Sequence, residues 1–208
     1  MSRRAIAWGL TLVCALIASA AYSLVSPTFD APTYWRPVCF ALMGGFGICS
    51  VFLLPSFQSK RRLLLAIWIP AILLRLFMLP TAPSDDVSRY LWEGKLVLNG
   101  VSPYTQTVDS EVVETYRDVY WEGINHREKA TAYPPLAQLS FAAVSGVFYH
   151  PMAFKIFYLL VDLLIIGGVL ALLRQRGLFL GYAGFYALNP LALVAFAGEG
   201  HFDVLMLA

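Results

Sequence analysis

Two adjacent carboxylates, Asp85 and Asp86, are the residues of this chain whose type and spacing best suit chemistry. They lie in the segment SDDVSRYLWEGK (residues 84–95), where Ser84 is expected to cap a helix whose first turn holds both acids. A carboxylate pair can take a proton from an attacking hydroxyl group, or hold a divalent cation against a departing phosphate. Acids in a first turn also complement the helix dipole without any further role. The pair alone leaves both interpretations open.

The helix that should carry these acids is amphipathic. Asp86, Arg89 and Glu93 share its polar face, so the helix is predicted to lie on a membrane surface with its acids at the lipid–water boundary. A lipid-linked phosphosugar would present its head group there, which makes Arg89 and Glu93 candidates for substrate binding. The apolar residues that recur at helical spacing are Val87, Tyr90, Leu91, Gly94, Val97 and Leu98.

The composition predicts that the remaining elements lie in a membrane. The chain has 208 residues, of which 59% are hydrophobic and 13% charged, too little charge for the surface of a soluble domain of this length. A helix needs about 20 apolar residues to cross a bilayer. Spans are predicted over residues 5–25, 38–54, 63–79, 153–173 and 178–197. We therefore expect an all-α polytopic membrane protein with a single membrane domain over its whole length.

The distribution of charge predicts the topology. Arg3 and Arg4 precede the first span, and the basic residues 60–62 join the second to the third, so both sites are expected in the cytoplasm. Residues 81–134 then form a long extracytoplasmic loop. This loop holds fourteen of the 28 charged residues, nine acidic and five basic. The chain is thus expected to be a multi-pass protein of the cell inner membrane with a cytoplasmic N-terminus.

The short apolar segment 136–149 leaves the later topology open. As a helix it reaches only about 21 Å, too short for a comfortable crossing. If it crosses, Arg174 and Arg176 lie outside and residues 199–203 inside. If it is re-entrant or interfacial, the arginines are cytoplasmic and residues 199–203 face the same side as the loop. The positive-inside rule favours the second threading. A new apolar run is cut at the last residue, so the chain is expected to be the amino-terminal part of a longer protein.

Charged residues inside the predicted spans are costly and therefore candidates for function. Arg75 lies one turn from the outer face, where its guanidinium could hold a carrier phosphate or simply snorkel to the interface. Asp162 is expected in a structural ion pair, and Lys155 is expected to snorkel. His201 is expected to act as a hydrogen-bonding group rather than a metal ligand, because no second histidine or cysteine is near it in sequence.

Further motifs follow the acidic pair in a fixed order. They are GVSPY at residues 100–104, YPPL at 133–136, NP at 189–190 and GHFD at 200–203. Together with the acids, this order resembles the first luminal loop of the C-type glycosyltransferase superfamily (GT-C). It is similar in particular to the mannosyltransferases that use dolichyl- or polyprenyl-phosphate mannose. The resemblance extends over residues 84–203.

The resemblance implies a GT-C-like transmembrane helix bundle with a long catalytic first loop. It implies an inverting transfer of a hexose, mannose above all, from a polyprenyl-phosphate sugar to an extracytoplasmic glycan or lipid acceptor. Either Asp85 or Asp86 would be the base, since subgroups of the superfamily differ on this point. No cofactor is implied beyond an optional divalent metal ion, and Phe202 weakens a metal assignment beside Asp203. The further substrate-binding candidates are Arg75, Tyr104, Tyr133, His201 and Asp203.

Two other classes of protein compete with this interpretation. A secondary transporter would use Arg75 and Asp162 inside its spans, but its polar groups should lie near the midplane, whereas most of them here lie in one external loop. A non-catalytic membrane scaffold would keep working without the loop acids. The partners expected are membrane lipid, the lipid-linked sugar and its acceptor, and a net charge of +2 does not indicate nucleic acid.

Overall fold

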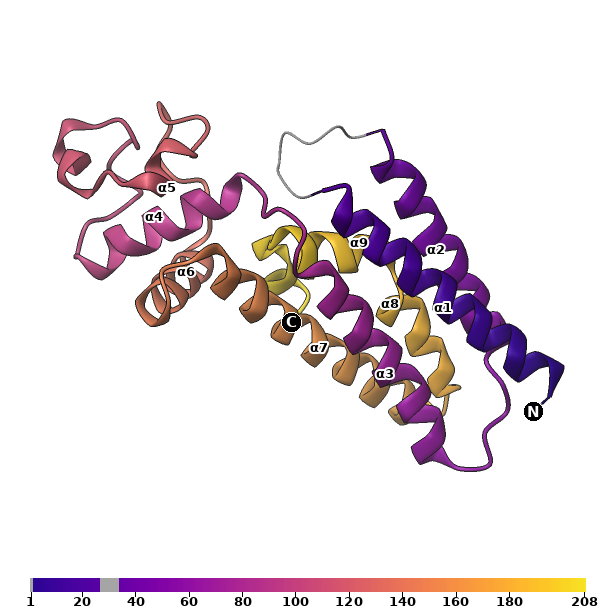
Figure 1. The fold of residues 1–208 in the computed structure, drawn as a ribbon. Helices are drawn as coiled ribbons and strands as arrows, with labels where there is room; N and C mark the ends of the chain where they lie inside the picture. Colours follow the sequence, from indigo (N-terminus) through magenta and orange to yellow (C-terminus); the bar gives the residue numbers. More distant parts are fainter. Residues whose placement is uncertain (1, 27–33) are drawn as a thin grey trace.

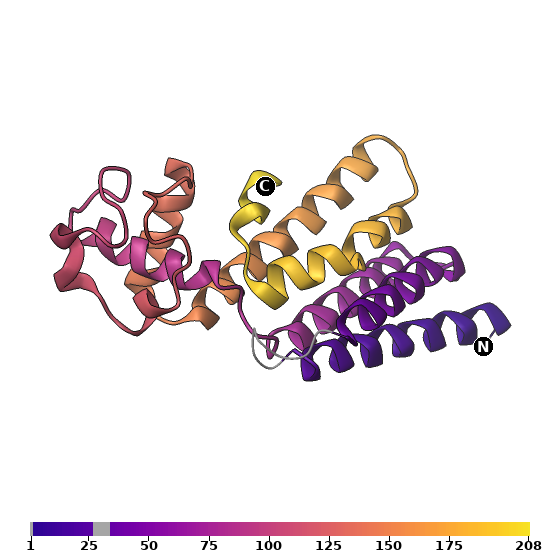
Figure 2. The same cartoon turned by 90° about the horizontal axis from the view of Figure 1, so that it is seen from above.

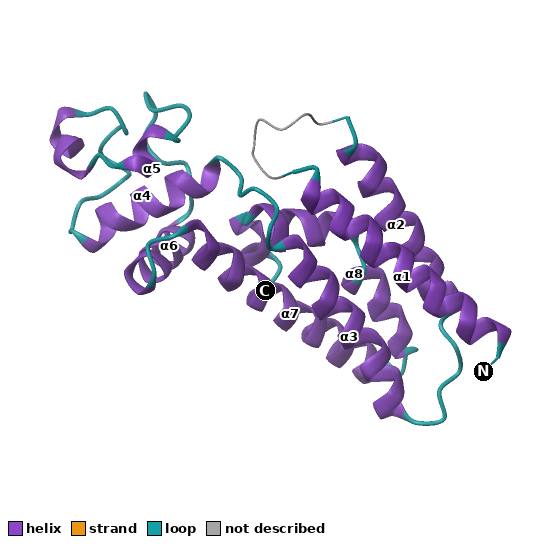
Figure 3. Cartoon of the chain, viewed as in Figure 1, coloured by secondary structure: helices purple, strands orange, loops and turns teal. Residues whose placement is uncertain are grey.

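The chain folds into helices joined by loops, and a computed structural model describes its residues 2–26 and 34–208. Every regular element in this part of the chain is helical (Figure 3). The prediction of an all-α membrane protein is confirmed. The longer helices are α1 (Arg3–Leu24), α2 (Arg36–Leu53), α3 (Lys60–Met78), α4 (Asp86–Leu98), α6 (Pro135–Val147) and α7 (Pro151–Gln175). The shorter ones are η1 (Glu111–Tyr116), α5 (Val119–Glu122), η2 (Leu180–Ala183), α8 (Gly184–Ala187), α9 (Pro190–Ala192), the π-helical η3 (Leu193–Glu199) and η4 (Phe202–Met206).

Among the described residues, three helices are long and apolar enough to cross a membrane. They are α1, α2 and α7, with mean hydropathies of 1.9, 1.6 and 2.6. Large apolar side chains on their outer faces are exposed, among them Leu10 at 61%, Ile17 at 63% and Leu164 at 73%. Apolar surface on this scale is typical of helices that face lipid.

The helix α3 corresponds to the span predicted over residues 63–79, and it packs against α1 and η3 inside the bundle. Lys60, Arg61, Arg62 and Arg75 give it more charge than α1, α2 or α7, so length and composition alone do not mark it as a span. One face of its central part is nevertheless buried in the bundle, with Ala71 and Arg75 fully enclosed. Packing, rather than hydropathy, therefore places α3 in the bundle.

The continuous helix predicted over residues 178–197 is instead broken. Residues 180–187 and 190–199 form two helical pieces bent by 48°. Pro190 causes the break, because it has no N–H to donate and its ring clashes with the preceding turn. The side chain of Asn189 then starts the second piece by accepting a hydrogen bond from the N–H of Leu191 (2.9 Å). The break turns the end of η3 toward α4.

The helices α4, α5 and α6 form a separate lobe at one end of the bundle (Figure 1). The apolar segment 136–149 is α6, and it packs along α4 in this lobe. The two helices touch at Gly94, where any side chain would collide with the backbone of Phe141. Ser145 Oγ also donates to the carbonyl of Leu91 (3.3 Å). Packing against α4 stabilises this short apolar helix outside the main bundle.

The other end of the bundle holds the N-terminus and the connections from α2 to α3 and from α7 to η2 (Figures 1 and 2). Residues 199–203 lie at the end of the bundle that faces the lobe. The N–H of Ser84, just before α4, donates to the carbonyl of Glu199 there (2.9 Å). This arrangement places the basic ends of α3 and α7 together and residues 199–203 beside the loop. The threading in which segment 136–149 does not cross the membrane stays a prediction.

Candidate functional site

Asp85 holds the start of α4 in place. It is the N-cap residue, with its Oδ1 accepting a hydrogen bond from the N–H of Asp86 (3.1 Å). Ser84, the cap predicted from the sequence, shares this N–H through its Oγ (3.3 Å). The second carboxylate oxygen of Asp85 accepts a hydrogen bond from Nδ2 of Asn125. Both oxygens of Asp85 are therefore occupied in fixing the helix start and the loop.

Asp86 has the less committed carboxylate of the pair. Its Oδ1 accepts a long hydrogen bond from the hydroxyl of Tyr133 (3.3 Å), and its Oδ2 lies 3.7 Å from Nδ1 of His201. Burial, followed by the charge of Asp85, raises the pKa of Asp86 above its ordinary value of 3.8, against the lowering effects of His201, Tyr133 and Arg89. A raised pKa makes this carboxylate a stronger proton acceptor than an aspartate in water.

His201 links Asp86 to a third carboxylate. Its Nε2 lies 3.2 Å from Oε2 of Glu199, while its Nδ1 faces Asp86. The hydrogen bond with Glu199 raises the pKa of His201 above 6.5, and the charges of Glu199, Asp86 and Asp203 act in the same direction against desolvation. When protonated, the imidazole ring supplies positive charge between carboxylates that would otherwise repel one another.

The π-helix η3 and the glycine after it position His201 next to Asp86. Gly200 has φ = 77°, a left-handed conformation that favours glycine, and it reverses the chain after Glu199. The N–H of His201 donates back to the carbonyl of Ala195 (2.9 Å). Single π-helical turns are frequent at functional sites. The broken helix thus brings a histidine and a carboxylate to the start of α4.

Lys155 fixes the segment that joins α3 to α4. Its side chain was expected to snorkel, but it is 1% exposed, and Nζ donates to the carbonyls of Leu79 (2.6 Å) and Thr81. These carbonyls lie beyond the end of α3 and have no further turn to bond them. The lysine satisfies them from α7 and so sets where α4 can begin.

Arg75 does not lie with the loop acids. It is fully buried inside the bundle, and its Nε pairs with Oδ2 of Asp162 at 2.6 Å. Its Nη1 donates to the carbonyls of Ala71 (3.0 Å) and Ala187 (2.8 Å), and the hydroxyl of Tyr186 donates to Asp162 (2.7 Å). The internal ion pair ties α3, α7 and α8 together, in place of the two predicted roles of holding a carrier phosphate or snorkelling to the interface.

Arg89 and Glu93 are also enclosed, although the sequence places them on the polar face of α4. Their side chains pair at 2.7 Å and are 8% and 1% exposed. Glu93 accepts further hydrogen bonds from Thr131 (2.8 Å) and Gln138, and Arg89 donates to the carbonyl of Lys129 (2.7 Å). The returning loop covers this face. The network joins α4 to that loop and to α6, rather than presenting the two side chains to a ligand.

Tyr104 and Tyr133, which are far apart in the sequence, meet each other, and Tyr133 lies beside Asp86. The hydroxyl of Tyr104 donates to the carbonyl of Tyr133 (2.7 Å), and the Tyr104 side chain is exposed. The hydroxyl of Tyr133 reaches Asp86, and burial raises its pKa above the ordinary value of 10. The rings packed around Tyr133 are those of Tyr90, Phe141 and Phe202.

Asp203 lies at the start of η4 and is exposed to solvent. It is close enough to His201 for its charge to raise the histidine pKa. Within residues 2–26 and 34–208, no group of three or more His, Cys, Asp or Glu side chains is arranged to hold a metal ion. A divalent ion at this site stays a prediction.

The sequence of this chain matches the model of a known family. Residues 32–208 match the MptA_B family, described as alpha-(1->6)-mannopyranosyltransferase, N-terminal domain. The chain belongs to this family. No curated protein and no solved structure matches it. The resemblance to mannosyltransferases that the loop motifs indicated is confirmed, and the matched residues include both the acidic pair and His201.

Two members of the site in this mannosyltransferase-family domain were absent from the sequence-based candidates. Asn125 has no local signal, since it lies in a loop where the next residue, His126, adopts φ = 47°. His126 itself is an exposed loop residue. Glu199 follows the apolar run 190–198, and an acid at the end of a predicted span is the one signal that could have suggested it.

Proposed function

We propose that this domain carries the catalytic base of a C-type membrane mannosyltransferase. The enzyme would transfer mannose from polyprenyl-phosphate mannose to a hydroxyl group of an extracytoplasmic glycan or lipid acceptor. The observation that supports this most is the environment of Asp86. It is a half-buried carboxylate of raised pKa at the start of a helix, between the hydroxyl of Tyr133 and the imidazole of His201. A general base needs this combination of access and basicity.

In this reaction Asp86 takes the proton of the acceptor hydroxyl as its oxygen attacks the anomeric carbon of mannose. The bond from that carbon to the phosphate oxygen breaks, and polyprenyl phosphate leaves with the electron pair. Attack opposite the leaving group inverts the anomeric configuration. Asp85 positions the helix start, and the description of the family suggests the 6-hydroxyl of a mannose residue as the acceptor group. The protonated His201 stabilises the carboxylate form of Asp86.

The lobe is suited to lie against a bilayer surface. Four large apolar side chains on or next to α6 are exposed, namely Leu136 at 66%, Leu139 at 63%, Val147 at 90% and Phe148 at 59%. A short helix with such a face lies in the interface between lipid and water. The polyprenyl chain of the donor could then stay in the lipid while its phosphate reaches the start of α4. We place this face outside the inner membrane and the N-terminus in the cytoplasm.

Positive charge for the donor phosphate must come from groups other than Arg75. His201 lies between Asp86 and Glu199, and Arg36 lines a small cavity together with Ser84 and Glu199 at the same end of the bundle. A divalent ion would supply further charge if it binds. The transporter alternative depended on Arg75 and Asp162, whose charges are already paired with each other.

The donor class is tested directly by supplying two mannose donors to membranes that contain the protein. We expect transfer of labelled mannose to a mannoside acceptor from polyprenyl-phosphate mannose and not from a nucleotide-linked mannose. The donor synthases of the host must be absent or inhibited, so that one donor cannot be converted to the other. Equal transfer from the nucleotide sugar under these conditions would overturn the proposal.

The pH profile should depend on His201. The base acts when ionised, so kcat/KM falls as the pH drops through the raised pKa of Asp86, above 3.8. Protonated His201 lowers that pKa by its charge. His201→Gln removes the charge and should move the acidic limb of the profile to higher pH. His126→Asn, in the same lobe but exposed and not among the groups that shift the pKa of Asp86, should leave the limb in place. An unmoved limb in His201→Gln would contradict the role given to the imidazole.

A further inference from the structure

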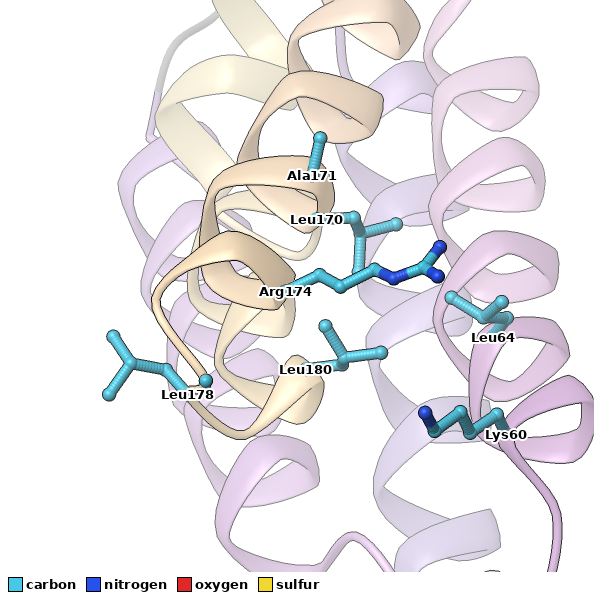
Figure 4. Close-up of a pocket in the computed structure, with 8 residues that line it drawn as sticks. Lys60, Leu64, Leu170, Ala171, Arg174, Leu178 and Leu180 are labelled. Carbon is cyan, nitrogen blue, oxygen red and sulfur yellow. The ribbon is translucent and has the colours of Figure 1, made fainter.

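A second site lies at the opposite end of the bundle from the loop acids. A cavity of about 620 Å³ opens there between α3 and α7 (Figure 4). Lys60 extends into it from α3 and Arg174 from α7, so that two cations reach into the same space from opposite walls. The apolar part of the lining comes from Leu64, Leu170, Ala171, Leu178 and Leu180.

The chain builds this cavity by a sharp turn after α7. Gly177 has φ = 65°, and the N–H of Leu178 donates back to the carbonyl of Leu173 (2.9 Å). This helix ending reverses the chain, and η2 returns beside α3. Leu180 therefore points into the space between the two helices, as Figure 4 shows. The cavity is a product of the fold and not of one mobile side chain.

The charge around the cavity is of one sign. Lys60 and Arg174 are exposed, and neither has an ion-pair partner among the described residues. No Asp or Glu occurs in residues 31–84 or 163–198, the sequence that surrounds this end of the bundle. Further positive charge comes from Arg61, Arg62 and Arg176 just outside the cavity. An anion bound here would meet no opposing carboxylate.

We propose that this cavity binds the head group of an anionic phospholipid. Lys60 and Arg174 would hold the phosphate, and the leucines of α3 and α7 would contact the start of the acyl chains. A free phosphate ion would gain nothing from apolar walls, whereas a lipid matches both parts of the lining. The basic end of the bundle is the end expected in the cytoplasm, and the cytoplasmic leaflet carries the anionic lipids. The site is separate from the transferase site and does not depend on that proposal.

The test compares two lipids that share their acyl chains and differ in charge. The purified protein in detergent is titrated with dioleoyl phosphatidylglycerol or dioleoyl phosphatidylcholine, and the bound lipid is counted by native mass spectrometry. We expect the first phosphatidylglycerol to bind at least about tenfold more tightly, since a basic residue contributes about fivefold near an anionic lipid surface. Free glycerol phosphate should not displace it. Equal binding of both lipids, or displacement by glycerol phosphate, would overturn the proposal.

Variants locate the site. Lys60→Gln with Arg174→Gln should remove the preference for phosphatidylglycerol. Arg61→Gln with Arg176→Gln removes the same charge from the same helix ends outside the cavity and should retain the preference. Ala171→Trp, which fills the cavity without changing charge, should weaken the first binding event in a folded protein, as checked by circular dichroism. Equal loss in the two double variants would show attraction to the whole surface instead of a site.

Discussion

Asp86→Asn is expected to lower mannosyl transfer by about 100-fold or more, the usual scale for loss of a general base. Asparagine has the same shape but cannot take the acceptor proton. Asp85→Asn should lower transfer by less than about tenfold, because asparagine caps a helix about as well as aspartate. The two changes each remove one negative charge from neighbouring positions, so each controls for the other.

Initial rates should be measured with polyprenyl-phosphate mannose at several acceptor concentrations, in membranes that hold matched amounts of each variant. A base that acts in the transition state lowers kcat and kcat/KM together. If Asp85→Asn were the more damaging change, the roles of the two acids would be exchanged. If neither variant lost activity, the acidic pair would be only a helix start.

Arg75→Met is expected to destabilise the bundle strongly. The change leaves the carboxylate of Asp162 buried without its partner, which costs about 3–5 kcal/mol, and the carbonyl of Ala187 loses a donor. For a chain of this size the unfolding midpoint should fall by about 10 °C. Combining Arg75→Met with Asp162→Leu removes both charges and should restore most of the loss, since apolar replacement of a buried pair is often neutral.

The unfolding midpoints of the parent chain, of Arg75→Met and of the double variant are measured by thermal unfolding in detergent, followed by circular dichroism. Leu76→Met, at an exposed position on the same helix, controls for changes that α3 tolerates on its lipid-facing side. An Arg75→Met protein as stable as the parent chain would show that the guanidinium is not needed inside the bundle. It would also reopen a role for Arg75 in binding a ligand.

Local features of the sequence determined most of the helical elements and one half of the site. Hydropathy located α1, α2 and α7, because lipid exposure requires a continuous apolar surface. Backbone chemistry located several boundaries. Gly100 ends α4 with φ = 74°, and α6 begins at Pro135, where a missing N–H costs nothing. The acidic pair was also evident from local chemistry, because serine and aspartate are favoured at a helix start.

Only the tertiary structure decided which polar groups meet. Arg75 and Asp162 are 87 residues apart and pair inside the bundle, while His201, itself paired with Glu199, reaches Asp86 from the other end of the chain. Arg89 and Glu93 lie on the polar face of α4, yet the returning loop buries them. Helical periodicity assigns a residue to a face but not to what covers that face. The partner of a charge depends on how the helices pack, which no local pattern contains.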